Sequence, residues 1–220
     1  MRLALTAHRL VANVGLALGA VALATGMPFE IPPSIHVERF GTVWLGAPVV
    51  AFLLPLATIV TDALLRTLGL GHPAVGGGAA VALPVYEAIM LRVTACVVGV
   101  HAMVLAALAG LLEGRAWAAP IVPLMLGITL VGVGNLCPRL KRNLAIGIRT
   151  QRTLADHQVW SRVHRHVGYI VMVCGVLTIT AAITVTAPVG PRMILIAGPL
   201  ALVAGGLLVR RAENAETRRS

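Results

Sequence analysis

The sequence contains few charged and few aromatic residues for its length. Asp, Glu, Lys and Arg make up 12% of the 220 residues and Phe, Trp and Tyr only 4%, whereas 58% are hydrophobic. A soluble domain is about one quarter charged, so this chain lacks the polar residues that would cover a globular surface. The apolar content also excludes a disordered chain. A mean hydropathy of +0.89 argues against a soluble DNA-binding domain, although the pI is about 11.4. The chain is therefore predicted to be an integral membrane protein.

Cysteine is scarce, and its spacing points to no metal or redox site. Cys96, Cys137 and Cys174 lie far apart, in or beside apolar runs. Histidines at 157, 164 and 166 lack the i and i+4 spacing of a metal-binding helix. We therefore expect no metal ion and no cofactor.

Long apolar runs account for more than half of the chain. A helix needs about 20 mostly apolar residues to cross a bilayer, and six such runs occur, at 8–27, 43–65, 88–111, 118–137, 167–187 and 191–209. They predict an all-α, polytopic membrane protein of about six transmembrane helices, with residues 1–220 forming one membrane domain. The first run follows Arg2 and Arg9 and ends in small residues, so its cleavage as a signal peptide stays an alternative.

Basic residues are distributed unevenly among the connections between these runs. If both termini lie inside, fourteen fall on the cytoplasmic side and three on the outer side, with Arg92 inside the third run. Because Lys and Arg accumulate in cytoplasmic loops, both termini are predicted to be cytoplasmic, with the basic connection against the anionic inner leaflet. The fourteen are Arg2, Arg9, Arg66, Arg139, Lys141, Arg142, Arg149, Arg152, Arg162, Arg165, Arg210, Arg211, Arg218 and Arg219.

Several ionisable residues lie within or beside the apolar runs. Charge in hydrocarbon is costly, so such residues are candidates for function. Asp62 and Arg66 have the i,i+4 spacing of a helical ion pair. We expect an intramembrane polar cluster of Asp62, Arg66, Glu87 and Arg92 near the cytoplasmic face, with Asn135 at the same depth. The cluster would either take part in the protein's function or only neutralise Arg92 and link neighbouring helices. His101, mid-span, fits a proton relay or an interhelical hydrogen bond.

The connection 138–166 carries the densest set of motifs. Pro138 ends the fourth run because proline has no N–H for a helical hydrogen bond. The Thr153 and Asp156 spacing predicts a capping box for a helix starting near Leu154. Trp160 and His164 then share a face with Asp156. We expect an interfacial cytoplasmic helix before the fifth span, with Trp160 as its anchor at the bilayer surface.

The same stretch carries a longer pattern. Gly134-Asn135-Leu136-Cys137-Pro138 is followed by Asn143, Gly147-Ile148-Arg149-Thr150, Thr153-Leu154, Trp160, His164 and Gly168. This pattern, over 134–168, resembles the signature of the SdpI family of membrane proteins. Upstream, the 28–42 outer connection has Pro28, Ile31-Pro32, His36 and Gly41, and is similar to a Pro-rich domain of unknown function that often precedes the signature. It is compressed here and lacks the Trp/Asn-rich stretch between His and Gly.

The resemblance implies a six-span protein of the bacterial inner (plasma) membrane with a non-enzymatic role in immunity or signal transduction. The family's named member protects producer cells from a secreted, membrane-active peptide toxin and is thought to hold a cognate repressor at the membrane. Implied partners are therefore a peptide toxin and a cytoplasmic repressor, without direct nucleic-acid binding. The implied partner-binding candidates are Asn135, Pro138, Asn143, Gly147, Arg149, Thr150, Thr153, Trp160 and His164.

The residues themselves leave two other classes of function open. One is a small membrane transporter or lipid-headgroup-handling protein that uses the polar cluster. The other is an enzyme that acts on lipid headgroups through Arg149 and His164. Against the enzyme, topology and anionic lipid already account for a basic loop.

Overall fold

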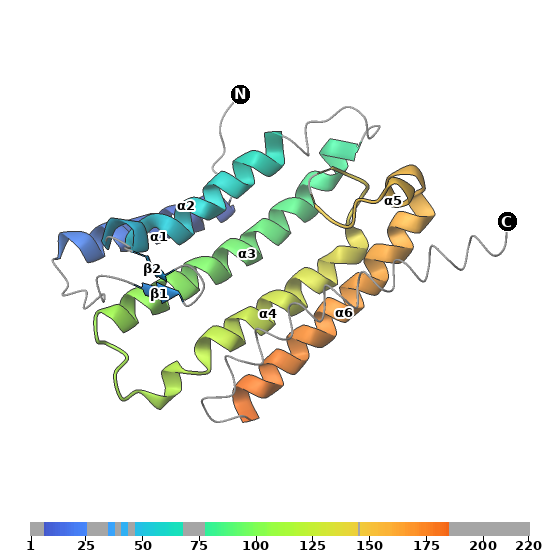
Figure 1. Cartoon of the computed structure of the whole chain (residues 1–220). Coiled ribbons are helices and arrows are strands. Elements are labelled where there is room, and N and C mark those ends of the chain that lie inside the picture. Colours follow the sequence, from blue (N-terminus) through green and yellow to red (C-terminus); the bar gives the residue numbers. More distant parts are fainter. Residues whose placement is uncertain are drawn as a thin grey trace.

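The computed structural model describes residues 7–25, 35–37, 41–43, 47–67, 78–144 and 146–184. These residues are almost entirely helical (Figure 1). The α-helices are α1 (Ala7–Ala24), α2 (Ala47–Leu65), α3 (Gly78–Leu108), α4 (Ile121–Leu136), α5 (Gln151–Ala155) and α6 (His157–Thr184). Two short 3₁₀ helices, η2 (Ala116–Ala118) and η3 (Cys137–Arg139), precede and follow α4.

Four helical segments are long and apolar enough to cross a bilayer. They are Ala7–Ala24, Leu83–Leu108, Ala116–Arg139 and His157–Thr184, and Ala51–Leu65 is a shorter apolar helix. The prediction of an all-helical, multi-pass membrane protein is confirmed at this level. The sixth predicted span, 191–209, lies outside the described residues.

One short hairpin interrupts the helical pattern. Strand β1 (Ile35–Val37) pairs antiparallel with β2 (Gly41–Val43), and Ile35 is opposite Val43. The hairpin overlaps the 28–42 connection, which joins the first two predicted spans. Its three-residue strands are too short to change the fold class.

Helix α3 lies in the middle of the bundle. It contacts α1 and α2 on one side and α4 on the other, and α6 packs against α4 (Figure 1). Two glycine pairs let α4 and α6 approach backbone to backbone. A Cβ atom on Gly134 would lie 2.7 Å from the Gly168 carbonyl oxygen, and one on Gly127 would lie 2.9 Å from the Gly175 carbonyl oxygen. Small residues at both helices are therefore required for this packing.

The segment around α5 differs from the predicted interfacial helix. Thr150 is the N-cap of α5 and forms a capping box with Thr153, so the prediction that Thr153 and Asp156 form the box is wrong. Asp156 instead caps the start of α6, because its Oδ1 accepts the Gln158 N–H at 2.6 Å. Helix α6 then runs unbroken over 28 residues, roughly 42 Å. The predicted interfacial helix and fifth span are thus largely one helix, which is longer than the hydrocarbon core is thick.

Candidate functional site

The connection 140–156 is called the loop below, and its described residues pack between the start of α3 and the start of α6. Trp160 is its anchor: the indole is fully buried (0% exposed) in a cluster with Ile89, Leu136 and Leu140. Its Nε1–H donates to the Leu140 carbonyl oxygen at 2.7 Å. Trp160 therefore lies inside the protein, and not at the bilayer surface as the sequence suggested.

His164 lies one turn beyond Trp160 and is equally enclosed (1% exposed). The two rings stack with centroids 4.0 Å apart. The Ile148 N–H donates to Nε2 at 3.1 Å, so Nε2 carries no proton. Nδ1 lies 2.9 Å from the Trp160 carbonyl oxygen and must hold the ring proton to donate to it. His164 is thus a neutral structural link between α6 and the loop.

Gly147 makes this link possible. Its φ angle is +110°, a backbone conformation that favours glycine. A Cβ atom at this position would lie 2.3 Å from the His164 Nε2 atom. The glycine is therefore required both by its own backbone conformation and by the imidazole that it contacts.

Asn143 and Thr153 form further hydrogen bonds within the loop. Asn143 Nδ2 donates to the Lys141 carbonyl oxygen at 2.7 Å, and Asn143 Oδ1 accepts the Ile146 N–H at 2.8 Å. Thr153 Oγ1 accepts the Thr150 N–H at 2.9 Å, and it donates to the Ile148 carbonyl oxygen at 2.8 Å. These side chains fix the course of the loop backbone.

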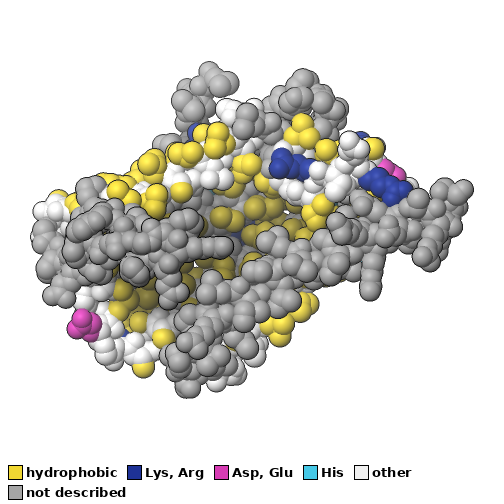
Figure 2. All heavy atoms as spheres, viewed as in Figure 1, with side chains coloured by type: hydrophobic (Ala, Val, Ile, Leu, Met, Phe, Trp, Pro, Cys, Tyr) yellow, Lys and Arg dark blue, Asp and Glu magenta, His cyan; other side chains and the backbone are white. Residues whose placement is uncertain are grey.

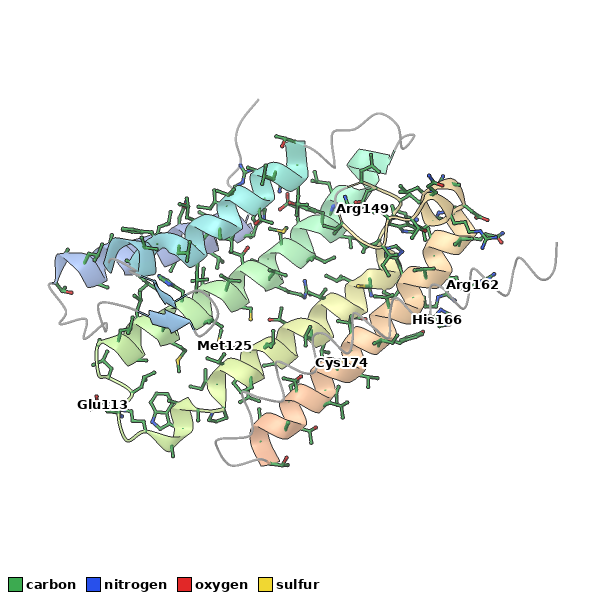
Figure 3. The ribbon with its side chains drawn as sticks, viewed as in Figure 1. Glu113, Met125, Arg149, Arg162, His166 and Cys174 are labelled. Carbon is green, nitrogen blue, oxygen red and sulfur yellow. The ribbon has the colours of Figure 1, made fainter. Side chains whose placement is uncertain are left out.

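Charged side chains cover the outside of the loop and its neighbouring helix ends. Arg149 is exposed, and its guanidinium donates to the Leu144 carbonyl oxygen. Arg149, Arg162 and His166 all lie toward the same end of the bundle, whereas Glu113 lies at the opposite end (Figure 3). We call this surface the basic face; its exposed members are Arg139, Lys141, Arg149, Arg152, Arg162 and Arg165.

Asp62 is the centre of a polar network at that end of α1, α2 and α3. It is almost fully buried (1% exposed). Arg9 Nε and Nη2 donate to its Oδ2 at 3.0 and 2.9 Å. Arg66 Nε and the Tyr86 hydroxyl donate to its Oδ1 at 2.7 and 2.8 Å. The buried carboxylate is therefore satisfied by donors from three helices.

Glu87 and His8 complete this ion network, which consists of His8, Arg9, Asp62, Arg66, Tyr86 and Glu87. Arg66 also donates to Glu87. His8 Nδ1 lies 2.9 Å from Glu87 Oε2, and His8 Nε2 lies 3.2 Å from Asp62 Oδ1. Sequence reasoning counted Arg9 only for topology and missed His8 and Tyr86. The available signal was that Asp62 has more acceptor sites than Arg66 alone can fill.

Arg92 and Asn135 lie apart from this network. Arg92 Nη1 donates to the Ala88 carbonyl oxygen of its own helix at 2.7 Å, and its side chain passes over Gly132 of α4. Asn135 of α4 and Pro138 of η3 are both exposed. The structure thus brings Asp62, Arg66 and Glu87 together as expected but separates Arg92 from them.

His101 is completely buried in α3. Its ring lies beside the Ala51 carbonyl of α2, although neither ring nitrogen has a hydrogen bond of good geometry. Pro55 follows Ala51 by four residues and lacks an N–H, so that carbonyl has no usual helical donor. The arrangement favours an interhelical contact over a proton relay.

The histidines at 157, 164 and 166 do not converge. His157 and His166 are exposed, whereas His164 is enclosed by Trp160 and the loop. Among the described residues, no group of three or more His, Cys, Asp or Glu side chains is arranged to hold a metal ion.

Comparison with known proteins identifies one segment. Neither the curated proteins nor the solved structures contain a significant match to the chain. The model of the SdpI/YfhL protein family matches residues 139–210, which begin at the end of η3 and include the loop, α5 and α6. The chain therefore carries an SdpI/YfhL family domain at residues 139–210.

Proposed function

We propose that this chain is a non-enzymatic immunity or signal-transduction protein of the bacterial plasma membrane. It has six spans and cytoplasmic termini. A membrane-active peptide contacts its apolar surface, and a cytoplasmic regulator binds the basic face. The family match supports the general class, and the way the loop uses its polar residues supports the mechanism.

The observation that carries the proposal is the division of roles within the loop. Asn143, Thr153 and His164 direct their polar atoms to the loop backbone. His164 uses both ring nitrogens, so it is not available as a general base. The exposed arginines, by contrast, are suited to charge-assisted hydrogen bonds with an acidic partner. A rigid loop that presents cations outward fits binding better than catalysis.

The apolar surface of the described helices supports contact with lipid or a hydrophobic peptide. Figure 2 shows hydrophobic side chains along the middle of the visible face and prominent Lys and Arg side chains toward one end. Large exposed residues include Ile128, Val173 and Leu177. A membrane-active peptide would meet the protein through such side chains.

Topology is tested by labelling with a membrane-impermeant maleimide. K141C reports the loop and E113C the opposite end, in a background in which the three native cysteines are replaced. Because basic loops stay inside, we expect E113C to be labelled in intact cells and K141C only after the cells are opened. The reverse pattern would contradict cytoplasmic placement of the basic face.

Immunity and signalling are tested separately in a sensitive bacterium. Expression of the protein should restore growth in the presence of a secreted, membrane-active peptide toxin. A well-expressed protein that protects against no member of a peptide panel would refute the immunity role. For signalling, a fluorescent cytoplasmic repressor should move to the membrane in cells with wild-type protein or R115Q, but not with R149Q. Equal recruitment by R149Q would refute binding through Arg149.

One observation favours a second candidate, a proton-linked transporter. The His8 imidazole lies between two carboxylates, 3.2 Å from Asp62 Oδ1 and 2.9 Å from Glu87 Oε2, so ionisable groups of α1, α2 and α3 meet at one site. Arg9, Arg66 and Tyr86 face the same site. Solute flux into proteoliposomes driven by a pH gradient, lost in H8Q and retained in H166Q, would support transport. Absence of flux for a panel of solutes would exclude it.

A further inference from the structure

We propose that the open face between α3 and α4 binds the phosphate group of an anionic phospholipid through Arg92, Asn135 and Arg139. The first observation is that Arg92 lies within the Leu83–Leu108 span and is exposed. A guanidinium in a bilayer needs an anionic or polar partner, because an unpaired charge is costly in hydrocarbon.

The carboxylates of the described residues are all engaged or distant. Asp62 and Glu87 belong to the ion network. Asp156 caps α6 through its Oδ1. Glu113 lies in the turns that follow α3, at the opposite end of the bundle from Arg149 (Figure 3). Within the described part of the chain, no carboxylate neutralises Arg92.

Gly132 gives the Arg92 side chain its path along α4. A Cβ atom on Gly132 would lie 2.8 Å from both Cδ and Nε of Arg92. Arg92 Nη1 reaches back to the Ala88 carbonyl oxygen at 2.7 Å, so the guanidinium points toward the start of α3. This single bond uses one of the five N–H donors of the guanidinium. Within the described residues, the other four donors form no hydrogen bond.

Asn135 and Arg139 continue the same surface. Helix α4 runs antiparallel to α3 (Figure 1), so the direction of the guanidinium leads from Gly132 toward the C-terminal end of α4. Asn135 follows Gly132 by three residues and so shares a face of α4 with it, and Arg139 ends η3, the 3₁₀ helix that follows α4. Both are exposed, and neither side chain forms a hydrogen bond within the described residues. Beyond Arg92, the exposed amide of Asn135 and the exposed guanidinium of Arg139 thus follow one another toward the C-terminal end of α4.

The chemistry of this edge fits a phospholipid. Guanidinium groups supply only donors and a phosphodiester supplies charged acceptors, which makes their hydrogen bonds strong. Toward the middle of α4, Ile128 (63% exposed) lies one turn before Gly132, where an acyl chain would pack. A phospholipid with its headgroup at the C-terminal end of α4 and its acyl chain beside Ile128 would have a matching contact for each of its two parts. Basic sites between spans bind such headgroups.

The test measures lipid binding by the full-length protein in detergent, using native mass spectrometry. The probes are phosphatidylglycerol, phosphatidylcholine and inorganic phosphate. We expect phosphatidylglycerol to bind most tightly and phosphate not to displace it. R92Q and R139Q should each weaken its binding about fivefold, since a basic residue near the surface contributes about that factor. N135L should weaken it too. R115Q, an exposed arginine at the opposite end, should bind like the wild type.

Four outcomes would overturn the proposal. Equal binding of phosphatidylcholine would mean that charge is not recognised, and displacement by phosphate would assign the site to the free anion. An equal loss in R115Q would reveal a general effect of net charge. R139Q and N135L keep the test valid even if R92Q does not fold, because they alter exposed side chains at the end of α4 and in η3. Unchanged binding by both, in folded protein, would also refute the site.

Discussion

Replacing Gly147 with alanine should destabilise the loop more than any other single methyl group added to it. The φ angle of +110° would become strained for alanine, at about 1–3 kcal/mol. The new Cβ would also lie 2.3 Å from His164 Nε2. The ring has little room to retreat because it stacks on Trp160, which is fully buried. Either the backbone or the imidazole must move.

Movement of the imidazole breaks the bond from the Ile148 N–H to Nε2. Losing a hydrogen bond of this kind costs about 1 kcal/mol, and more when the donor stays buried. Together with the backbone strain, G147A should lower the free energy of unfolding by about 3 kcal/mol. The measurement is equilibrium unfolding of the purified protein in detergent micelles, followed by tryptophan fluorescence, since Trp160 lies under the affected bond.

A matched control separates backbone strain from the steric contact. Gly114 has a φ angle of +66°, and nothing lies within 4 Å of a Cβ placed there. G114A should therefore cost only about 1–2 kcal/mol, the price of a left-handed conformation. In an H164A background the clash is absent, so G147A should cost at least ~1 kcal/mol less than in the wild type. The reasoning is refuted if G147A is no more destabilising than G114A, or if H164A leaves its cost unchanged.

Three further substitutions test other contacts by the same unfolding measurement. W160F keeps the buried ring but leaves a carbonyl without its donor, and should cost about 1–3 kcal/mol; a neutral result would contradict the importance of the indole bond. D62N removes the charge that three helices share and should cost about 3–5 kcal/mol, whereas T67A, at an exposed residue just after α2, should be neutral. G168A pushes against the α4 backbone, while G99A meets only the flexible end of a methionine. The former should therefore be the more damaging by at least ~1 kcal/mol, and equal effects would argue against close α4–α6 packing.

Sequence patterns predicted the features that depend on local properties. Apolar length is sufficient to indicate a membrane span, because the bilayer solvates each helix independently of its neighbours. The Asp62–Arg66 pair followed from helical spacing alone. The motif across 134–168 indicated the family, and the family match at 139–210 overlaps it. The capping prediction failed because Thr150 and Thr153 both fit an N-cap, and only the folded loop selects between them.

The tertiary structure decided which residues share a site. Arg9 and His8 reach Asp62 because α1 packs against α2 and α3, whereas Arg92 projects toward α4 and away from the same carboxylate. Hydrophobic periodicity carries little of this information in a chain whose helices are apolar on every side. Which faces meet is set by close approach at small residues such as Gly134 and Gly168 and by buried polar contacts, and these depend on pairs of helices far apart in the sequence.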